Sequence, residues 1–430
     1  MSGNGRQVVI SGIGLLTALG EGPETNWKAL LEGHSGIRPI QEYDTSHLQT
    51  RLGAEIDGFD PARFASRRQL NTMNRGDQLG LAAATLALRD AGIDTSNELG
   101  GRTGLFLGGN KSMGRMGQLI SGLRAVRRPD GTPDMKLLGE TADTIMPPLF
   151  FVEGLQPGAV FHVSQTFGIR GVNAFFAGTA DAGATAIARA ARAIRRGEAD
   201  RIVAGGYDDA TSWWSMTHLD RIGVLTTRNE LGAAAFRPYD QNRSGAVLGE
   251  GGAVLVLEEK EAARARGARI YAEVSGVGNG HDARTPPATD PQGRGLTRAV
   301  RRALDDARLN PADLGYIASH GAATKIGDRS ETAALRTVLG EASRSVPVSC
   351  VKPQTGHLVG GAGALNVVFS ALALHHGDIP ATAHLESPDA ACDMDLVRGD
   401  ARTAAHPATA LALARGIEGQ AVALALSRPA

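Results

Sequence analysis

Short runs of apolar residues alternate along the chain with segments in which apolar residues recur every three or four positions. The apolar runs lie at 7–14, 103–109, 201–206, 252–259, 315–321 and 346–352. Runs of this length predict buried strands, and the segments between them have the period of helices that cover a sheet with one face. This alternation is typical of an α/β protein whose sheets are covered on both faces.

A repeat predicts that the chain is built from two similar halves. The string VISGIG at 9–14 returns as EVSGVG at 273–278, and LRDAGID at 88–94 returns as LDDARLN at 304–310. In each half a strand that ends in small residues then follows. We therefore expect an N-terminal half over residues 1–255 and a C-terminal half over residues 256–430.

Residues 173–206 have the pattern of a catalytic elbow, with an apolar strand, a tight turn of small residues, an amphipathic helix and a second strand. The helix has an apolar stripe formed by Ile187, Ala190, Ala191 and Ile194. Ala180 stands at or just before the helix N-terminus. Free N–H groups and the positive dipole end would there lower the pKa of a thiol or bind a thioester oxygen. The methyl side chain of alanine benefits from neither the free N–H groups nor the dipole, so the turn lacks an evident nucleophile.

Composition narrows the possible partners. The chain has 430 residues, of which 42% are apolar, and its 45 basic side chains balance 45 acidic ones. It therefore has no global field to attract nucleic acid or an acidic membrane surface, and an acidic partner needs a local basic patch. We find no secretory signal and no apolar run that approaches the length of a membrane span, so we expect a cytoplasmic protein. The two cysteines, Cys350 and Cys392, lack metal-ligand spacing, and we expect neither a metal nor a disulfide.

Several long motifs resemble the signatures of β-ketoacyl-[acyl-carrier-protein] synthases. They lie at 8–22, 167–173, 237–258, 319–331 and 351–368, so the resemblance runs over nearly the whole chain. It implies the thiolase fold, an α/β fold of two similar βαβαβαββ halves in a five-layered αβαβα core, and no cofactor. It also implies a dimer across the strand before the elbow. Phe175 and Phe176 are adjacent there and must point to opposite faces, so we expect one in the core and the other near the subunit interface or pocket.

The resemblance also identifies the expected site. In that family the elbow reads roughly Thr-Ala-Cys-x-Ser-Gly, and its cysteine carries the acyl chain as a thioester. Ala180 takes the place of that cysteine, whereas His320, Lys352 and His357 match the two histidines and the lysine of the family site. Two neutral imidazoles suit a decarboxylation, because they can donate hydrogen bonds to a thioester oxygen as negative charge develops. Both histidines can equally be remnants held by structural hydrogen bonds.

Two acidic residues after the first histidine are implied to support the site. They are Asp328 and Glu331. We expect Glu331 to form a buried ion pair with Lys352, because a single unpaired charge in a core is costly. Cys350 lies two residues before Lys352, and the alternation around it favours a buried strand thiol over a substitute nucleophile.

Two further positions depart from the family pattern. The family threonine after His-Gly is Ala322, and the family's C-terminal Gly-Phe-Gly-Gly gating loop is replaced by Gly416, Ile417, Glu418 and Gly419. The C-terminal segment that contains this loop resembles the chain-length factors, or KSβ subunits, of type II polyketide synthases. Those proteins lack the cysteine but often carry glutamine in its place and commonly lose the histidines, which this chain keeps.

Three functions follow as hypotheses. The first is a non-condensing KSβ-like subunit that pairs with a cysteine-bearing ketosynthase (KSα), works with an acyl carrier protein and shapes the tunnel for a polyketide or fatty acyl chain. The second is a malonyl-[acyl-carrier-protein] decarboxylase that supplies starter units. The third is an acyl-binding protein without chemistry.

Overall fold

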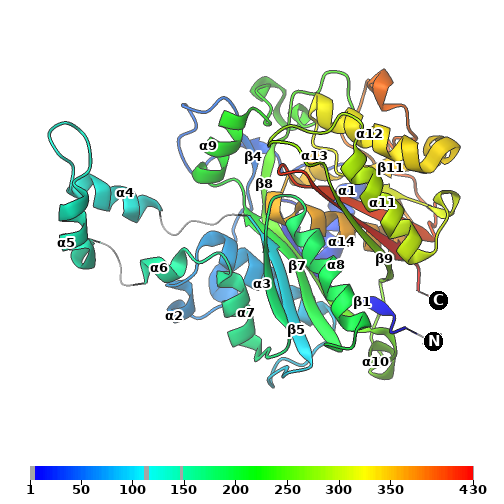
Figure 1. Ribbon diagram of the computed structural model, residues 1–430, viewed down its shortest axis with the longest axis horizontal. Coiled ribbons are helices and arrows are strands. Elements are labelled where there is room, and N and C mark those ends of the chain that lie inside the picture. The colour runs from blue at the N-terminus through cyan, green and yellow to red at the C-terminus, as the bar shows by residue number, and fades with distance from the viewer. Residues whose placement is uncertain (1–4, 111–115, 146–148, 430) are drawn as a thin grey trace.

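The computed structural model describes residues 5–110, 116–145 and 149–429. Its main strands follow one another across the sheet in the order β11, β10, β12, β13, β9, β1, β8, β7, β5 and β6 (Figure 1). The N-terminal strands are β1 (Val8–Thr17), β5 (Thr103–Gly109), β6 (Asn173–Ala177), β7 (Arg201–Asp209) and β8 (Leu248–Glu259). The C-terminal strands are β9 (Ala272–His281), β10 (Ile317–Ala318), β11 (Val348–Ser349), β12 (Thr409–Arg415) and β13 (Gln420–Ser427).

The two sets of strands meet where β9 pairs with β1. Only the start of β9 takes part, with Val9 opposite Glu273 and Ile10 opposite Ala272. The two outer strands of the sheet differ in length, since β6 has five residues and β11 has two. Among the described strands β6 pairs only with β5, so its other edge is unpaired.

Helices lie in three layers around the strands. Helices α8 (Ala182–Arg195) and α14 (Ala362–His376) contact each other between the two sets of strands; α8 packs on β5 and β7, and α14 packs on β12. Helix α3 (Arg75–Asp90) covers β1 and β8, and helix α11 (Arg294–Ala307) covers β9 and β13. The order helix, sheet, helix, sheet, helix is the five-layered arrangement that we expected.

Close contacts of glycine reveal the similarity of the two halves. A Cβ atom on Gly14 of β1 would lie 1.8 Å from the carbonyl oxygen of Ala83 in α3. A Cβ atom on Gly278 of β9 would lie 2.0 Å from the carbonyl oxygen of Ala299 in α11. The repeated glycines of the sequence thus let one helix approach one strand equally closely in each half, because no side chain fits between them.

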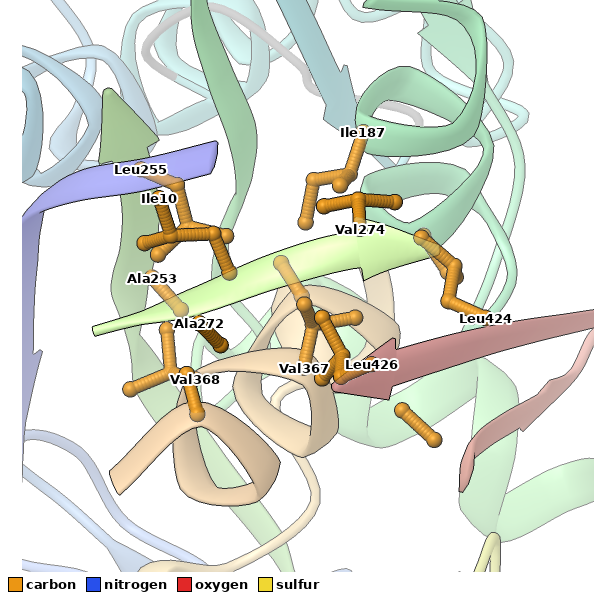
Figure 2. Close-up of a cluster of buried hydrophobic side chains, with 14 of the residues drawn as sticks. Ile10, Ile187, Ala253, Leu255, Ala272, Val274, Val367, Val368, Leu424 and Leu426 are labelled. Atoms are coloured by element: carbon orange, nitrogen blue, oxygen red, sulfur yellow. The ribbon is translucent and has the colours of Figure 1, made fainter. Parts of the chain in front are cut away.

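The largest hydrophobic core lies between the two sets of strands. Figure 2 shows side chains from both halves meeting there, with Ile187 of α8 and Val367 of α14 near Val274 of β9 and Leu426 of β13. All four residues are almost completely buried. This core joins the halves into one unit and fixes α8 at the centre of the molecule.

Helix α14 corrects one expectation from the sequence. We expected no apolar run of membrane-spanning length, but Val359–His376 has a mean hydropathy of 1.2 over 18 residues and is long and apolar enough by composition. In the fold 89% of this segment is buried. Its apolar residues occupy all sides of the helix because α14 lies in the central layer, where protein surrounds it.

Four further helices lie outside the layers described so far. Helices α4 (Met116–Ala125) and α5 (Met135–Ile145) contact each other and project away from the sheet in Figure 1. Helices α9 (Trp213–Ile222) and α12 (Lys325–Leu339) lie at the same end of the molecule in that view. The loops before α8 and after β10 and β12, together with these two helices, surround a cavity.

Candidate functional site

A cavity of about 600 Å³ is lined by half of the residues that the sequence predicted for the site. Its apolar wall includes Leu219, Ile222, Leu225, Leu248 and Val359. Its chemically distinctive residues are Ala180, His320, Ala322, His357, Arg415, Gly416, Ile417 and Gly419. Three other predicted residues, Lys352, Asp328 and Glu331, are buried and do not line the cavity.

Ala180 occupies the turn between β6 and α8, two residues before the helix begins, and is only 2% exposed. Small residues allow the approach of α14 at this point. A Cβ atom on Gly363 would lie 2.6 Å from the carbonyl oxygen of Ala180 and 2.7 Å from the Cβ of Ala184. The turn is therefore held rigidly against the central helices, and it presents a methyl group to the cavity where a nucleophile would stand.

His357 presents one defined hydrogen-bond donor to the cavity. It follows the short helix α13 (Lys352–Thr355), and its Nδ1 accepts a hydrogen bond of 3.0 Å from the backbone N–H of Val359. Burial, and after it the charge of Lys352, lowers the pKa of His357 to about 3. The ring is therefore neutral at physiological pH, and because Nδ1 is the acceptor, Nε2 carries the proton.

His320 lies beside His357, with 5.7 Å between the ring centroids and an angle of 83° between the ring planes. It follows β10, and its backbone is anchored through Glu331, whose carboxylate accepts hydrogen bonds from the N–H groups of His320 and Gly321 at 2.7 and 2.9 Å. Burial, and after it the ammonium group of Lys352, keeps the pKa of His320 well below its usual range. Two neutral imidazoles therefore face the cavity together.

The expected ion pair between Lys352 and Glu331 is wrong in its detail. The buried Nζ of Lys352 donates to the carbonyl oxygen of His320, whereas Glu331 binds the two backbone N–H groups and the hydroxyl of Tyr239. The peptide backbone at His320 thus lies between the two charges. Each charge is satisfied by polar backbone groups, so neither has to reach the other.

Asp328 supports the same region from α12. Its carboxylate accepts a hydrogen bond of 2.8 Å from the backbone N–H of Tyr239 and pairs with the guanidinium of Arg243 at 3.1 Å. Both side chains of the pair are fully buried. Burial outweighs the nearby cation and raises the pKa of Asp328 to about 7.

The loop between β12 and β13 is fastened to the elbow by Thr179. The backbone N–H of Ile417 donates to Thr179 Oγ1 at 2.9 Å, and that hydroxyl donates to Glu418 Oε2 at 2.8 Å. The neighbouring Asp181 is 6% exposed, and its Oδ1 has no hydrogen-bond partner among the described residues. Burial, and after it the charge of Glu418, raises the pKa of Asp181 to about 6.

Sequence reasoning missed Thr179, Asp282 and Arg415 as site residues. Arg415 Nη2 and Asp282 Oδ2 form an ion pair of 3.0 Å, and both residues line the cavity. A signal for Thr179 existed, because it stands where the family elbow has alanine, and Glu418 stands where the family loop has glycine. Because these two departures from the family sequence contact each other in the fold, Thr179 and Glu418 are candidates for a joint role.

Two expected residues lie away from the cavity. Phe176 packs against Phe106, with ring centroids 5.9 Å apart, and Phe175 packs against Tyr207 at 6.5 Å. They join different hydrophobic clusters, which confirms that they point to opposite faces of β6. Both are partly exposed at the unpaired edge, and neither lines the cavity.

Neither cysteine can replace the missing nucleophile. Cys350 is buried behind Gly321, and burial raises the pKa of its thiol to about 11. Cys392 is also buried, and its pKa is likewise raised to about 11 by burial. In the part of the chain that the structure describes, no three His, Cys, Asp or Glu side chains come together to hold a metal ion.

Comparison with known proteins connects this site to a family. The family model for the beta-ketoacyl synthase N-terminal domain matches residues 5–263, and the model for the C-terminal domain matches residues 271–386. We expected the two halves to divide after residue 255, which lies within β8. A boundary at that residue stays a proposal. The chain is 35% identical over 399 residues to 3-oxoacyl-[acyl-carrier-protein] synthase 2 of Vibrio cholerae, covering 92% of this chain and 93% of that protein.

Solved structures give the same result. The chain superposes on a protein described as the ishigamide ketosynthase/chain length factor with a TM-score of 0.87 and 30% identity, covering 99% of this chain and all of the other. A β-ketoacyl synthase from Burkholderia phymatum gives a TM-score of 0.86 at 30% identity with the same coverage. A ketosynthase solved in complex with its type II polyketide synthase acyl-carrier protein gives 0.88 at 25%, again covering 99% of this chain and all of the other. With its thiolase-like α/β fold and family matches along most of its length, the chain belongs to the beta-ketoacyl synthase family.

Proposed function

We propose that this chain is a non-condensing subunit, similar to a chain-length factor (KSβ), that associates with a cysteine-bearing ketosynthase and shapes the path of its acyl chain. The observation that carries the proposal is Ala180. It stands at the N-terminus of α8 beside two neutral histidines, in a site that keeps both family histidines but lacks the group that would hold an acyl chain. A methyl group cannot accept an acyl group, so covalent catalysis is not available here.

The unpaired edge of β6 supports association with a homologous chain. No described strand pairs with the outer backbone groups of Asn173–Ala177, and its two phenylalanines are partly exposed. An edge of this kind is a ready template for another strand. We propose that the corresponding strand of the ketosynthase pairs with it across a pseudo-two-fold axis and buries on the order of 2,000 Å² or more.

The relatives support the choice of partners. One superposing structure is described as a ketosynthase/chain length factor, and another as a ketosynthase bound to an acyl-carrier protein. We accordingly propose an acyl carrier protein as the source of thioesters for the pair, and a polyketide or fatty acyl chain as its product.

The purified single chain should make no carbon–carbon bond when it is incubated with acyl and malonyl carrier proteins. The physical reason is the missing thiol at Ala180 together with the inaccessibility of Cys350. Mass spectrometry of the carrier protein detects a β-keto product directly, and a co-expressed cysteine-bearing ketosynthase is the positive control. Chain extension by the single chain would refute the proposal.

A second function is favoured by one specific observation, the fixed donor at His357 Nε2. A malonyl thioester that binds with its carbonyl oxygen near this donor loses carbon dioxide as its carbon–carbon bond breaks. The electron pair then forms an enolate that the histidines stabilise, and a solvent proton completes an acetyl thioester. Neither step needs a cysteine.

Carbon dioxide release from malonyl carrier protein tests this second function. Retention of activity in Ala180→Ser and its loss in His357→Ala would assign the chain as a decarboxylase. If no carbon dioxide is released and a ketosynthase co-purifies with the chain, the result supports the first function, the KSβ-like subunit. Absence of both would point to the third hypothesis, an acyl-binding protein without chemistry.

A further inference from the structure

The edge of β9 that faces away from β13 is covered by charged side chains. Strand β1 pairs only with the first two residues of this edge, and α8 and α11 contact β9 beyond them (Figure 1). The N–H of Val277 donates to Asp306 Oδ2 of α11 at 2.9 Å, and the carbonyl oxygen of Val277 accepts from Arg192 of α8 at 3.4 Å. Because side chains already occupy its backbone groups, this edge is not open to another strand.

Arginines continue along the same edge at every second residue of β9. The carbonyl oxygen of Asn279 accepts from Arg302 Nη1 at 2.8 Å, and that of His281 accepts from Arg298 Nη2. Carbonyl groups two residues apart point to the same side of a strand and are about 6.6 Å apart. We call Arg192, Arg298 and Arg302 the arginine row. Their remaining N–H groups form no hydrogen bond with the described residues, and the two arginines of α11 are exposed.

The arginine row carries positive charge that the described chain does not neutralise. Asp306 lies beside the row but already pairs with Arg195 at 2.8 Å. No described carboxylate forms an ion pair with a member of the row. Burial, and after it the charge of Arg189, lowers the pKa of Arg192. Because neighbouring guanidinium groups repel one another, a bound anion would interact favourably with several of them at once.

The surroundings of the row favour a peptide over a nucleic acid. Helices α8 and α11 and strand β9 contain no phenylalanine, tyrosine or tryptophan on which a base could stack. The basic and acidic side chains of the chain balance at 45 each, so no wider field would hold a long polyanion. Side chains on one face of an extended peptide recur every two residues, which matches the spacing of the carbonyl groups that anchor the row.

We propose that the arginine row docks an extended segment of a partner protein that carries carboxylates at alternate positions. Guanidinium groups bind carboxylates through charge-assisted hydrogen bonds, which are stronger than bonds between neutral groups. The row does not line the cavity, so its occupancy does not depend on the proposed function. Because the ion pairs would form at the surface, we expect binding that is weak and sensitive to salt.

Fluorescence anisotropy of the full chain with a fluorescein-labelled peptide of alternating glutamate and threonine tests the proposal. Raising the salt concentration from about 0.05 M to about 0.5 M should weaken binding at least about tenfold, because salt screens exposed charges. The double variant Arg298→Gln with Arg302→Gln should bind the peptide at least about fivefold more weakly than wild type at low salt. A peptide of alternating glutamine and threonine should not bind.

Two double variants provide matched controls. Arg67→Gln with Arg68→Gln removes the same charge from α2 (Arg67–Leu70), which lies on the opposite side of the molecule from α11 in Figure 1. It should change the affinity by less than about twofold. Arg298→Lys with Arg302→Lys keeps the charge and should stay within about threefold of wild type. The near-ultraviolet circular dichroism spectrum and the Tm establish that each variant is folded.

If the double glutamine variant of α11 does not fold, the single variants at the exposed Arg302 decide. Arg302→Gln should weaken binding about threefold, and Arg302→Lys should weaken it less. Three results would overturn the proposal: no measurable binding of the glutamate peptide at low salt, equal losses in the α11 and α2 glutamine variants, or tighter binding of a thymidylate oligonucleotide of equal length. The last result would assign the row to single-stranded nucleic acid.

The titration needs no partner subunit, which separates it from the tests of the proposed function. Failure to associate with a ketosynthase would refute the proposed function and leave the arginine row unaffected. Failure of the glutamate peptide to bind would refute the docking site and leave the proposed subunit role intact.

Discussion

A methyl group at Ala180 is surrounded by groups that would serve a nucleophile. The N-terminus of α8 lies two residues away, and two neutral imidazoles line the same cavity. The carboxylate of Glu418 is bonded to the neighbouring residue, Thr179. The helix terminus favours a negative charge at residue 180, whereas the carboxylate opposes it.

We expect Ala180→Cys to restore a thiol but little chain extension. The carboxylates of Glu418 and Asp181 oppose both thiolate formation and the negative charge of the reacting carbonyl, and Ala322 lacks the family hydroxyl. Loss of one well-placed oxyanion donor costs about 10² to 10³ in rate, so extension should be at least about 10²-fold slower than that of the cysteine-bearing partner. Mass spectrometry reports acylation of the protein and extension of the chain separately.

The double variant Ala180→Cys with Glu418→Gly is the informative control, because it removes the opposing charge and should extend faster than the single variant. A single variant that extends at the partner's rate would show that the pocket is intact. That result would favour the decarboxylase function over the subunit function.

Asp181 should make stability fall as the pH rises through its titration. Its folded pKa of about 6 lies above the ordinary value near 4, so the folded chain holds a proton that the unfolded chain has lost. The contribution of Asp181 to stability is therefore greatest below pH 4, and about 2 to 3 kcal/mol of it is lost by pH 7. Asp181→Asn lacks this loss, so its advantage over wild type in the free energy of unfolding should grow from pH 4 to pH 7. A constant difference in urea denaturation across that range would contradict the assignment.

At the residue scale, the sequence predicted which residues form the site better than it predicted which of them contact each other. Ala180, His320 and His357 were predicted as neighbours through the family resemblance, and they share one cavity. The pairing of Lys352 with Glu331 was wrong, because charge counting cannot show that the backbone at His320 satisfies both groups. The Thr179–Glu418 contact joins positions 239 residues apart, a separation at which local pattern carries no information.

Among the elements, the repeated glycines make the strongest prediction. Gly14→Ala and Gly278→Ala should each lower the free energy of unfolding by about 3 kcal/mol or more, because the added methyl group meets a backbone carbonyl that cannot move without its helix. Gly101→Ala is the matched control, since nothing lies within 4 Å of its Cβ position. It should change stability by less than about 0.5 kcal/mol in the same denaturation experiment. Equal effects at the three positions would show that the strands and helices are less tightly packed than described.

The predicted elements differ in how well the sequence located them. The runs at 103–109 and 252–259 became β5 and the second part of β8, since long buried strands have continuous apolar residues. The runs at 315–321 and 346–352 gave only the two-residue strands β10 and β11. Their remaining residues leave the sheet to deliver His320 and Lys352 to the site, and apolar character alone does not distinguish a strand from a buried loop that follows it.

For the whole molecule we expect that association is needed for a well-behaved protein. Expressed without a cysteine-bearing ketosynthase, the chain should be poorly soluble or form a weak homodimer, because the edge of β6 and its partly exposed phenylalanines remain uncovered. Co-expression should yield a soluble one-to-one complex. Multi-angle light scattering measures both states. A stable, monodisperse monomer would contradict the proposed interface.

The unequal outer strands of the sheet limit how large an assembly can become. A five-residue strand at one margin can extend the sheet into another molecule, whereas the two-residue strand at the opposite margin offers too little backbone to do the same. Among the described strands, each chain thus offers one edge that is long enough for sheet extension. Once two molecules have paired through β6, the outer edge of β6 is covered in both. The assembly therefore ends at a pair and cannot extend into a fibre.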